Sequence, residues 1–258
     1  GIMIIDGDAI YSDTEQKPLL EYSSLLNLSC LFAQFNFSYL EAMDAFQYYC
    51  HYRGWGRSKK ITQQFEALLI KSKRLRVKKY LKKTFRNCTN FIVTQDWWQR
   101  RIWCRAYDSI ELRKFLMAVK SQSFSNPKTI LKQGNTCSII KSQVGEKALV
   151  IKRYNIKNIF HALSRCLRST RAKKSWENAH RLKFLDIPTP EPIALIEEKV
   201  GILNRTAYFI YQYHDADTLD KVIANSINWQ FIGHRTVNLL QALYTEQLRH
   251  GDLKATNF

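Results

Sequence analysis

The sequence lacks paired cysteines and long apolar runs, and it has few glycines and few acidic residues. Its six cysteines include no C-x-x-C pair and no regular spacing, so neither a zinc site nor a disulfide framework is indicated, and reduced thiols are the simpler interpretation. No apolar run approaches the ~20 residues of a helix that spans a membrane. With 258 residues, of which 45% are hydrophobic, the chain can form one large domain or two smaller ones.

Acidic residues are scarce relative to basic ones. The chain has 22 Asp and Glu against 40 Lys and Arg, which leaves a net charge of +18. A positive field of this size favours phosphates, nucleic acid or an anionic membrane surface as partners. The basic stretches 71–86 and 165–174 lack the interleaved aromatics and the helix-turn-helix pattern of nucleic-acid binders, so we do not expect nucleic acid. A solvated helix face and adsorption to anionic lipid both remain open.

Hydrophobic periodicity and composition predict three segments with different structure. They are a helical region at 1–60, a basic helical linker with a hairpin at 61–127, and a mixed region at 128–258. The first contains a capping box at Ser38 and Glu41. The second places its hairpin at 91–107 and ends where the composition changes, at 123–127. In the third, three strands precede a helix, two more strands and further helices, which is an α+β arrangement.

The stretch "RHGDLKATNF" at 249–258 carries the clearest chemical signal. Asp252 can accept a proton from an attacking hydroxyl, Lys254 can neutralise a transferring phosphate, and Asn257 can bind a magnesium ion. The alternative is a polar turn after a helix, because His-Gly-Asp occurs by chance in many loops. The combination of these groups in one loop favours phosphoryl transfer from ATP with Mg²⁺.

Residues upstream fit the nucleotide side of the same reaction. Lys152 lies in the strand-like run "ALVIKRY", where an ammonium can grip the α and β phosphates, although an exposed edge charge is the alternative. Glu177, in the helical run "KKSWENAHRL", can orient that lysine or form an ordinary surface salt bridge. Glu191 is a weaker rival because it lies between prolines. The turn "LKQGNTCSI" offers a single glycine, Gly134, where protein kinases have three.

From about residue 80 to 258 the chain resembles the bacterial lipopolysaccharide kinases, the kinase-like group that includes heptose and Kdo kinases. The resemblance rests on the segments "LKQGNTCSI", "LVIKRYNIKN", "RAKKSWENAHRLKFLDIPTPEPIAL" and "HGDLKATNF". It implies a protein-kinase-like α+β fold with an antiparallel-sheet N-lobe and a helical C-lobe. It also implies the roles given above for Lys152, Glu177, Asp252 and Asn257.

The opening of the chain resembles the part of this family that follows the catalytic loop. "IIDGDAI" is similar to the family's metal-binding segment, which would make Asp6 a magnesium ligand. "AFQYYCHYRGWGR" at 45–57 is similar to the family's final helix, so residues 1–60 resemble part of a C-lobe. We expect either a fragment of a tandem kinase, with two incomplete domains, or one permuted kinase in which Asp6 completes the site of Asp252.

The resemblance implies an ATP-dependent phosphotransferase that acts on a sugar hydroxyl of the lipopolysaccharide core or of another glycolipid. A kinase acting on protein hydroxyls and a non-catalytic kinase-like scaffold are the alternatives. We expect a cytoplasmic protein in peripheral contact with the anionic inner face of the cytoplasmic membrane. The acceptor hydroxyl, the oligomeric state and the activity of this piece by itself stay open.

Overall fold

The computed structural model shows two compact units, 1–78 and 79–258. The residues that the structure describes are 19–35, 37–56, 58–121, 129–134, 136–155, 169–200, 203–225 and 228–255. The expected boundary at 123–127 lies outside these residues. The predicted segment boundary after residue 60 falls in the first turn of a helix, Lys59–Lys83, which extends past the division between the units at residue 78.

The first unit is helical over its described residues. Its elements are α1 (Glu21–Phe32), α2 (Tyr39–Tyr52) and most of α3 (Lys59–Lys83). The predicted capping box is present at the start of α2, where the Ser38 hydroxyl accepts from the Glu41 amide and the Glu41 carboxylate accepts from the Ser38 amide. The three helices share one buried core, in which the rings of Phe46 and Phe65 stack at 4.2 Å between centroids.

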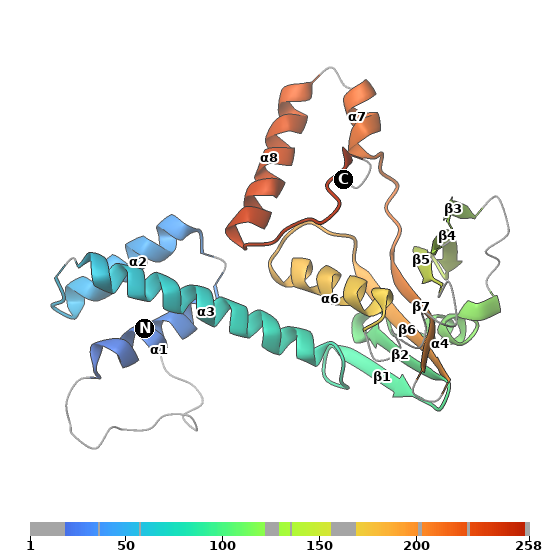
Figure 1. The fold of residues 1–258 in the computed structure, drawn as a ribbon, viewed down its shortest axis with the longest axis horizontal. Coiled ribbons are helices and arrows are strands. Elements are labelled where there is room, and N and C mark those ends of the chain that lie inside the picture. The colour runs from blue at the N-terminus through green and yellow to red at the C-terminus, as the bar shows by residue number, and fades with distance from the viewer. Residues whose placement is uncertain are drawn as a thin grey trace. The chain divides into compact units, whose positions relative to one another are not determined.

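The second unit is built on one seven-stranded antiparallel sheet (Figure 1). Its strands are β1 (Phe91–Gln95), β2 (Gln99–Cys104), β3 (Ile130–Gln133), β4 (Cys137–Val144), β5 (Lys147–Tyr154), β6 (Pro192–Val200) and β7 (Leu203–Gln212). Their order in space is β1-β2-β6-β7-β5-β4-β3. The predicted α+β class is confirmed, and the predicted hairpin is present as β1 and β2. The sequence did not indicate that this hairpin joins the same sheet, through pairing of β2 with β6.

Two helices cover opposite faces of the sheet. Side chains alternate between faces along each strand, so Ile151 and Ile210 pack on the side of α4 (Ile110–Met117). Tyr154 and Phe209 instead pack with α6 (Arg171–Phe184), which contacts β5, β6 and β7. The helices α7 (Leu219–Asn225) and α8 (Trp229–Thr245) follow the last strand. The chain therefore runs from the sheet into helices, as the predicted kinase-like fold requires.

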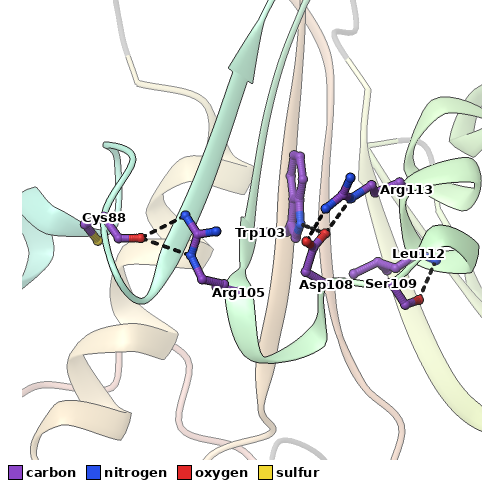
Figure 2. A network of polar contacts seen from close by, with 7 residues as sticks. All are labelled: Cys88, Trp103, Arg105, Asp108, Ser109, Leu112 and Arg113. Carbon is purple, nitrogen blue, oxygen red and sulfur yellow. Dashed lines mark hydrogen bonds and ion pairs between the residues drawn. The ribbon is translucent and has the colours of Figure 1, made fainter.

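A polar network fixes the connection between β2 and α4 (Figure 2). The Asp108 carboxylate accepts from the Trp103 indole at 2.9 Å and from the Arg113 guanidinium, whose Nε lies at 2.8 Å. These bonds hold the pKa of Asp108 down at about 2, chiefly through Arg113. The Ser109 hydroxyl caps α4 by accepting from the Leu112 amide. The hairpin is thus joined to the helix that covers its face of the sheet.

Candidate functional site

Lys152 lies inside the sheet, on β5. Its register partners are Ile139 on β4 and Phe209 on β7, so strands on both sides fix its backbone. Strand alternation places its half-buried side chain on the α6 face, together with Tyr154. The Lys152 ammonium lies 5.6 Å from the centroid of the Tyr154 ring. This placement differs from the exposed edge charge that was the alternative, because neither edge strand is β5.

The turn before β4 leads into the strand that pairs with the strand of Lys152. Burial raises the pKa of the Cys137 thiol at the start of β4, and the positive charge of Lys152 opposes that rise. Gly134 ends the described part of the turn, and a Cβ there would come within 3.2 Å of the Cys137 carbonyl oxygen. A larger residue would push against backbone, so glycine permits the tight return of the chain. The strand that follows this turn, β4, is therefore the strand that pairs with Lys152.

Glu177 lies on α6, the helix that covers the Lys152 face of the sheet. It is half-buried and follows the fully buried Trp176. Within the described ranges, Lys152 and Glu177 form no ion pair with each other. The rival carboxylate, Glu191, forms an ion pair with Lys183 near the end of α6. Glu177 is accordingly on the element that faces Lys152, and Glu191 is engaged elsewhere.

The loop after α8 brings two predicted catalytic residues together. Helix α8 ends at Thr245, and Gln247 adopts a positive φ of 54°, which turns the chain out of the helix. The Lys254 ammonium then lies 2.8 Å from the Asp252 carboxylate. Both side chains are about two thirds exposed, at 65% and 64%. An exposed carboxylate and ammonium side by side can meet a hydroxyl and a phosphate at once.

Helix α6 is held against the sheet by buried polar contacts that the sequence analysis did not single out. The Tyr80 hydroxyl lies 3.2 Å from Nδ1 of His180, and the Cys104 Sγ lies 3.9 Å from Nε2. Burial lowers the pKa of His180 to about 3 and raises that of Cys104 to about 12. His180 is therefore a neutral packing residue. Its spacing of four from Trp176 on one helix face was the available signal.

At the amino end of α6, a threonine links the helix to the sheet. The Thr170 hydroxyl accepts from the Lys173 amide and donates to Oε1 of the buried Glu197 on β6, at 2.6 Å. One side chain thus caps the helix and satisfies a buried carboxylate. Together with the His180 contacts, this bond limits how far the helix carrying Glu177 can shift.

Two predicted magnesium ligands, Asp6 and Asn257, lie outside the described residues. Among the residues that are described, no group of three or more His, Cys, Asp or Glu side chains forms a metal site. The structure therefore brings together Asp252 with Lys254, and it places Lys152 on the strand that pairs with β4, which follows the turn at Gly134. Glu177 is placed on the helix behind Lys152 without direct pairing.

The described site combines features that are typical of a protein-kinase-like protein. They are a lysine within an antiparallel sheet, a glutamate on the helix that covers it, and an aspartate and lysine in the loop after a long helix. A family comparison agrees, because the model described as the Lipopolysaccharide kinase (Kdo/WaaP) family matches residues 116–258, more than half of the chain. The chain belongs to this family. The match covers β3 to β7 and leaves the β1–β2 hairpin and the helical first unit outside it.

Searches of curated proteins and of solved structures returned no match. Among the helices in the described ranges, none combines the length and the apolar character that a bilayer span requires.

Proposed function

We propose that this protein is an ATP-dependent kinase that phosphorylates a sugar hydroxyl of the lipopolysaccharide core or of a related glycolipid. The observation that carries the proposal is the Asp252 and Lys254 pair, 2.8 Å apart, in the loop after α8 of a chain in this family. Family membership supports a lipopolysaccharide-related substrate.

In this proposal, Asp252 acts on the acceptor hydroxyl and Lys254 acts on the transferring phosphoryl group. The acceptor oxygen attacks the γ-phosphorus of ATP, its proton passes to the Asp252 carboxylate, and the bond from phosphorus to the ADP oxygen breaks. Lys254 would neutralise charge on the transferring phosphoryl group. Their proximity, 2.8 Å between the ammonium and the carboxylate, supports these two roles.

Nucleotide binding in this proposal depends on Lys152, Glu177 and Gly134. The Lys152 ammonium would bind the α and β phosphates, and the turn at Gly134 would let the backbone approach them. Glu177 would pair with Lys152 when nucleotide is bound, since it lies on the helix that covers that face. Asn257 and Asp6 would hold Mg²⁺, which neutralises phosphate charge when bound.

Replacing Asp252 tests the proposal most directly. The variant Asp252→Asn keeps the side-chain shape and removes the base, so transfer of labelled γ-phosphate to purified core oligosaccharide should fall by about 10²–10⁴-fold. Asp44→Asn, at an exposed position on α2, is the matched control and should keep full activity. Transfer that persists unchanged in Asp252→Asn would exclude the assigned mechanism.

A non-catalytic scaffold is the second candidate function. It is favoured by the single glycine of the phosphate turn and by the missing ion pair between Lys152 and Glu177 in the described part of the chain. Titration calorimetry with ATP and Mg²⁺ separates the candidates, because a scaffold would show no binding. A labelling reaction that offers protein and glycolipid acceptors together tests the remaining alternative, a kinase of protein hydroxyls.

The arrangement of domains also stays a prediction. Residues 1–60 would be part of a C-lobe, either of a preceding kinase domain or of the same permuted domain. A structure that places Asp6 and Asp252 within reach of one metal ion would support the permuted arrangement. We further propose a cytoplasmic location with peripheral contact at the anionic membrane face, where a glycolipid acceptor would be met.

A further inference from the structure

Two adjacent tryptophans form the turn between β1 and β2. Trp97 is 79% exposed and Trp98 is 59% exposed, although tryptophan is usually well buried. We call the turn Asp96–Trp98 the tryptophan tip. It lies at the end of the β1 arrow in Figure 1, before the start of the family match at residue 116. No role in phosphoryl transfer accounts for it.

The backbone of the tryptophan tip is held in place although its indoles are exposed. The Asp96 carboxylate accepts from the amides of Trp98 and Gln99 at 2.8 and 2.7 Å, and these bonds lower its pKa. The same carboxylate forms an ion pair with Arg101 at 3.2 Å. The indoles are therefore presented on an ordered turn, so little conformational entropy is lost when they bind a partner.

A neighbouring strand supports the tip from the side. The Lys199 amide on β6 donates to the Trp98 carbonyl at 2.7 Å, and Gln99 pairs with Glu198. The tip is accordingly hydrogen-bonded into the end of the sheet formed by β2, β6 and the start of β7.

Basic side chains dominate the charge around the tip. The buried Glu198 already pairs with the exposed Lys120 at 3.4 Å. Lys199 and the exposed Arg205, from β6 and β7, form no ion pair with any residue in the described ranges. Among the residues described, two cations without an ion-pair partner thus lie on the strands beside two exposed indoles. This combination complements an anionic surface with an apolar layer beneath it.

We propose that the tryptophan tip inserts into the headgroup region of an anionic lipid bilayer and docks the protein there. Indoles concentrate at the membrane interface because they combine an apolar ring with a polar N–H, and lysine and arginine bind anionic headgroups. A protein partner would need a far larger complementary patch than a two-residue projection, at least about 1,000 Å². The inference deepens the proposed function, since it rests on an acceptor carried by the membrane.

Vesicle binding of the intact chain tests the proposal without ATP. The chain should sediment with vesicles of phosphatidylcholine and phosphatidylglycerol, and brominated acyl chains should quench its tryptophan fluorescence. The double variant Trp97→Ala/Trp98→Ala should bind these vesicles at least about tenfold more weakly, and the quenching should disappear. Trp97→Tyr/Trp98→Tyr should restore most of the binding, because tyrosine is also an interfacial residue.

The matched control is Trp229→Ala, which removes another exposed indole, 70% accessible, from α8. It should bind vesicles like the unaltered chain, and all variants should keep the same thermal unfolding midpoint. Undiminished vesicle binding by the double alanine variant would overturn the proposal. The proposal would also be overturned if the double alanine variant lost self-association in sedimentation and kept its vesicle binding. The tip would then contact a second copy of the chain.

A kinase assay with water-soluble, deacylated core oligosaccharide separates this inference from the proposed function. The double alanine variant should phosphorylate that acceptor at the normal rate, since the tip lies outside the catalytic groups. Normal vesicle binding with no phosphoryl transfer by any form would refute the kinase and leave the docking surface standing.

Discussion

At the scale of single residues, the candidate site depends on how a few charged side chains are presented. Lys152 is half-buried between two strands, whereas Asp252 and Lys254 are exposed in a loop. In the proposed function, Lys152 would hold the nucleotide in one position, because hydrogen bonds to strands on both sides fix its backbone. A loop pair can adapt to an acceptor. The two kinds of position suit the two kinds of contact that phosphoryl transfer requires.

Removing the Lys152 charge should weaken nucleotide binding. In Lys152→Met the stem still packs in the sheet, but the charge-assisted bonds to phosphate are lost, so the Kd for ATP should rise by about 10–100-fold. Titration calorimetry measures this change. Lys147→Met, at an exposed position of the same strand, is the control and should leave the Kd unaltered. An equal loss in both variants would assign the effect to the strand's general charge.

At the scale of elements, α6 is fixed to the sheet along its length. Thr170 ties its first turn to Glu197, and His180 contacts Tyr80 and Cys104 in its second half. Tyr80 belongs to α3 and Cys104 to β2, so elements outside the family match hold a helix inside it. This support explains why the hairpin belongs to the same folding unit as the site.

The neutral state of His180 should make the stability of the second unit depend on pH. Its pKa falls from 6.5 to about 3 on folding, so the unfolded chain binds a proton below 6.5 that the folded chain does not. Stability is therefore fully present above pH 6.5 and declines toward about pH 3, by at most ~1.4 kcal/mol per pH unit. Urea titrations between about pH 8 and about pH 5 should show this slope.

The variant His180→Gln should flatten that slope, since it removes the titrating ring. It should also lower stability at neutral pH, because the buried contacts with Tyr80 and Cys104 are disturbed. His234→Gln, on the exposed part of α8, serves as the control and should keep the slope. A slope that is identical in His180→Gln and in the unaltered chain would contradict the buried neutral assignment.

At the scale of the whole molecule, the chain contains two units with separate cores. The core of the first joins α1, α2 and α3, and those of the second lie on the two faces of the sheet. The family match falls entirely within the second unit. The net charge of +18 belongs to the whole chain and favours adsorption to anionic surfaces. Insertion of the tryptophan tip would give the adsorbed protein one orientation.

Destabilising the first unit should leave nucleotide binding by the second intact. Phe65 is fully buried and stacks on Phe46, so Phe65→Ala should cost the first unit ~3–5 kcal/mol of unfolding free energy. Tyr48→Ala, at a position 71% exposed on α2, should cost little. Urea unfolding followed by circular dichroism would measure both. The Kd for ATP should change by less than about twofold, and a larger rise in Phe65→Ala would show coupled units.

Local pattern was sufficient to predict the hairpin, the order of strands and helices, and the proximity of Asp252 to Lys254. These features arise between residues close in the sequence, where periodicity and spacing act directly. The capping box of Ser38 and Glu41 is a further example, since both partners belong to one turn.

Only the tertiary structure decided that the hairpin pairs with β6, that α6 covers the Lys152 face, and that His180 is buried while Trp97 and Trp98 are not. Each of these depends on segments that are far apart in the chain. An aromatic residue has the same local pattern whether it is packed or exposed. Which of the two occurs is determined by strand pairing and by the helices that cover each face, and the amino-acid sequence alone, read locally, contains neither.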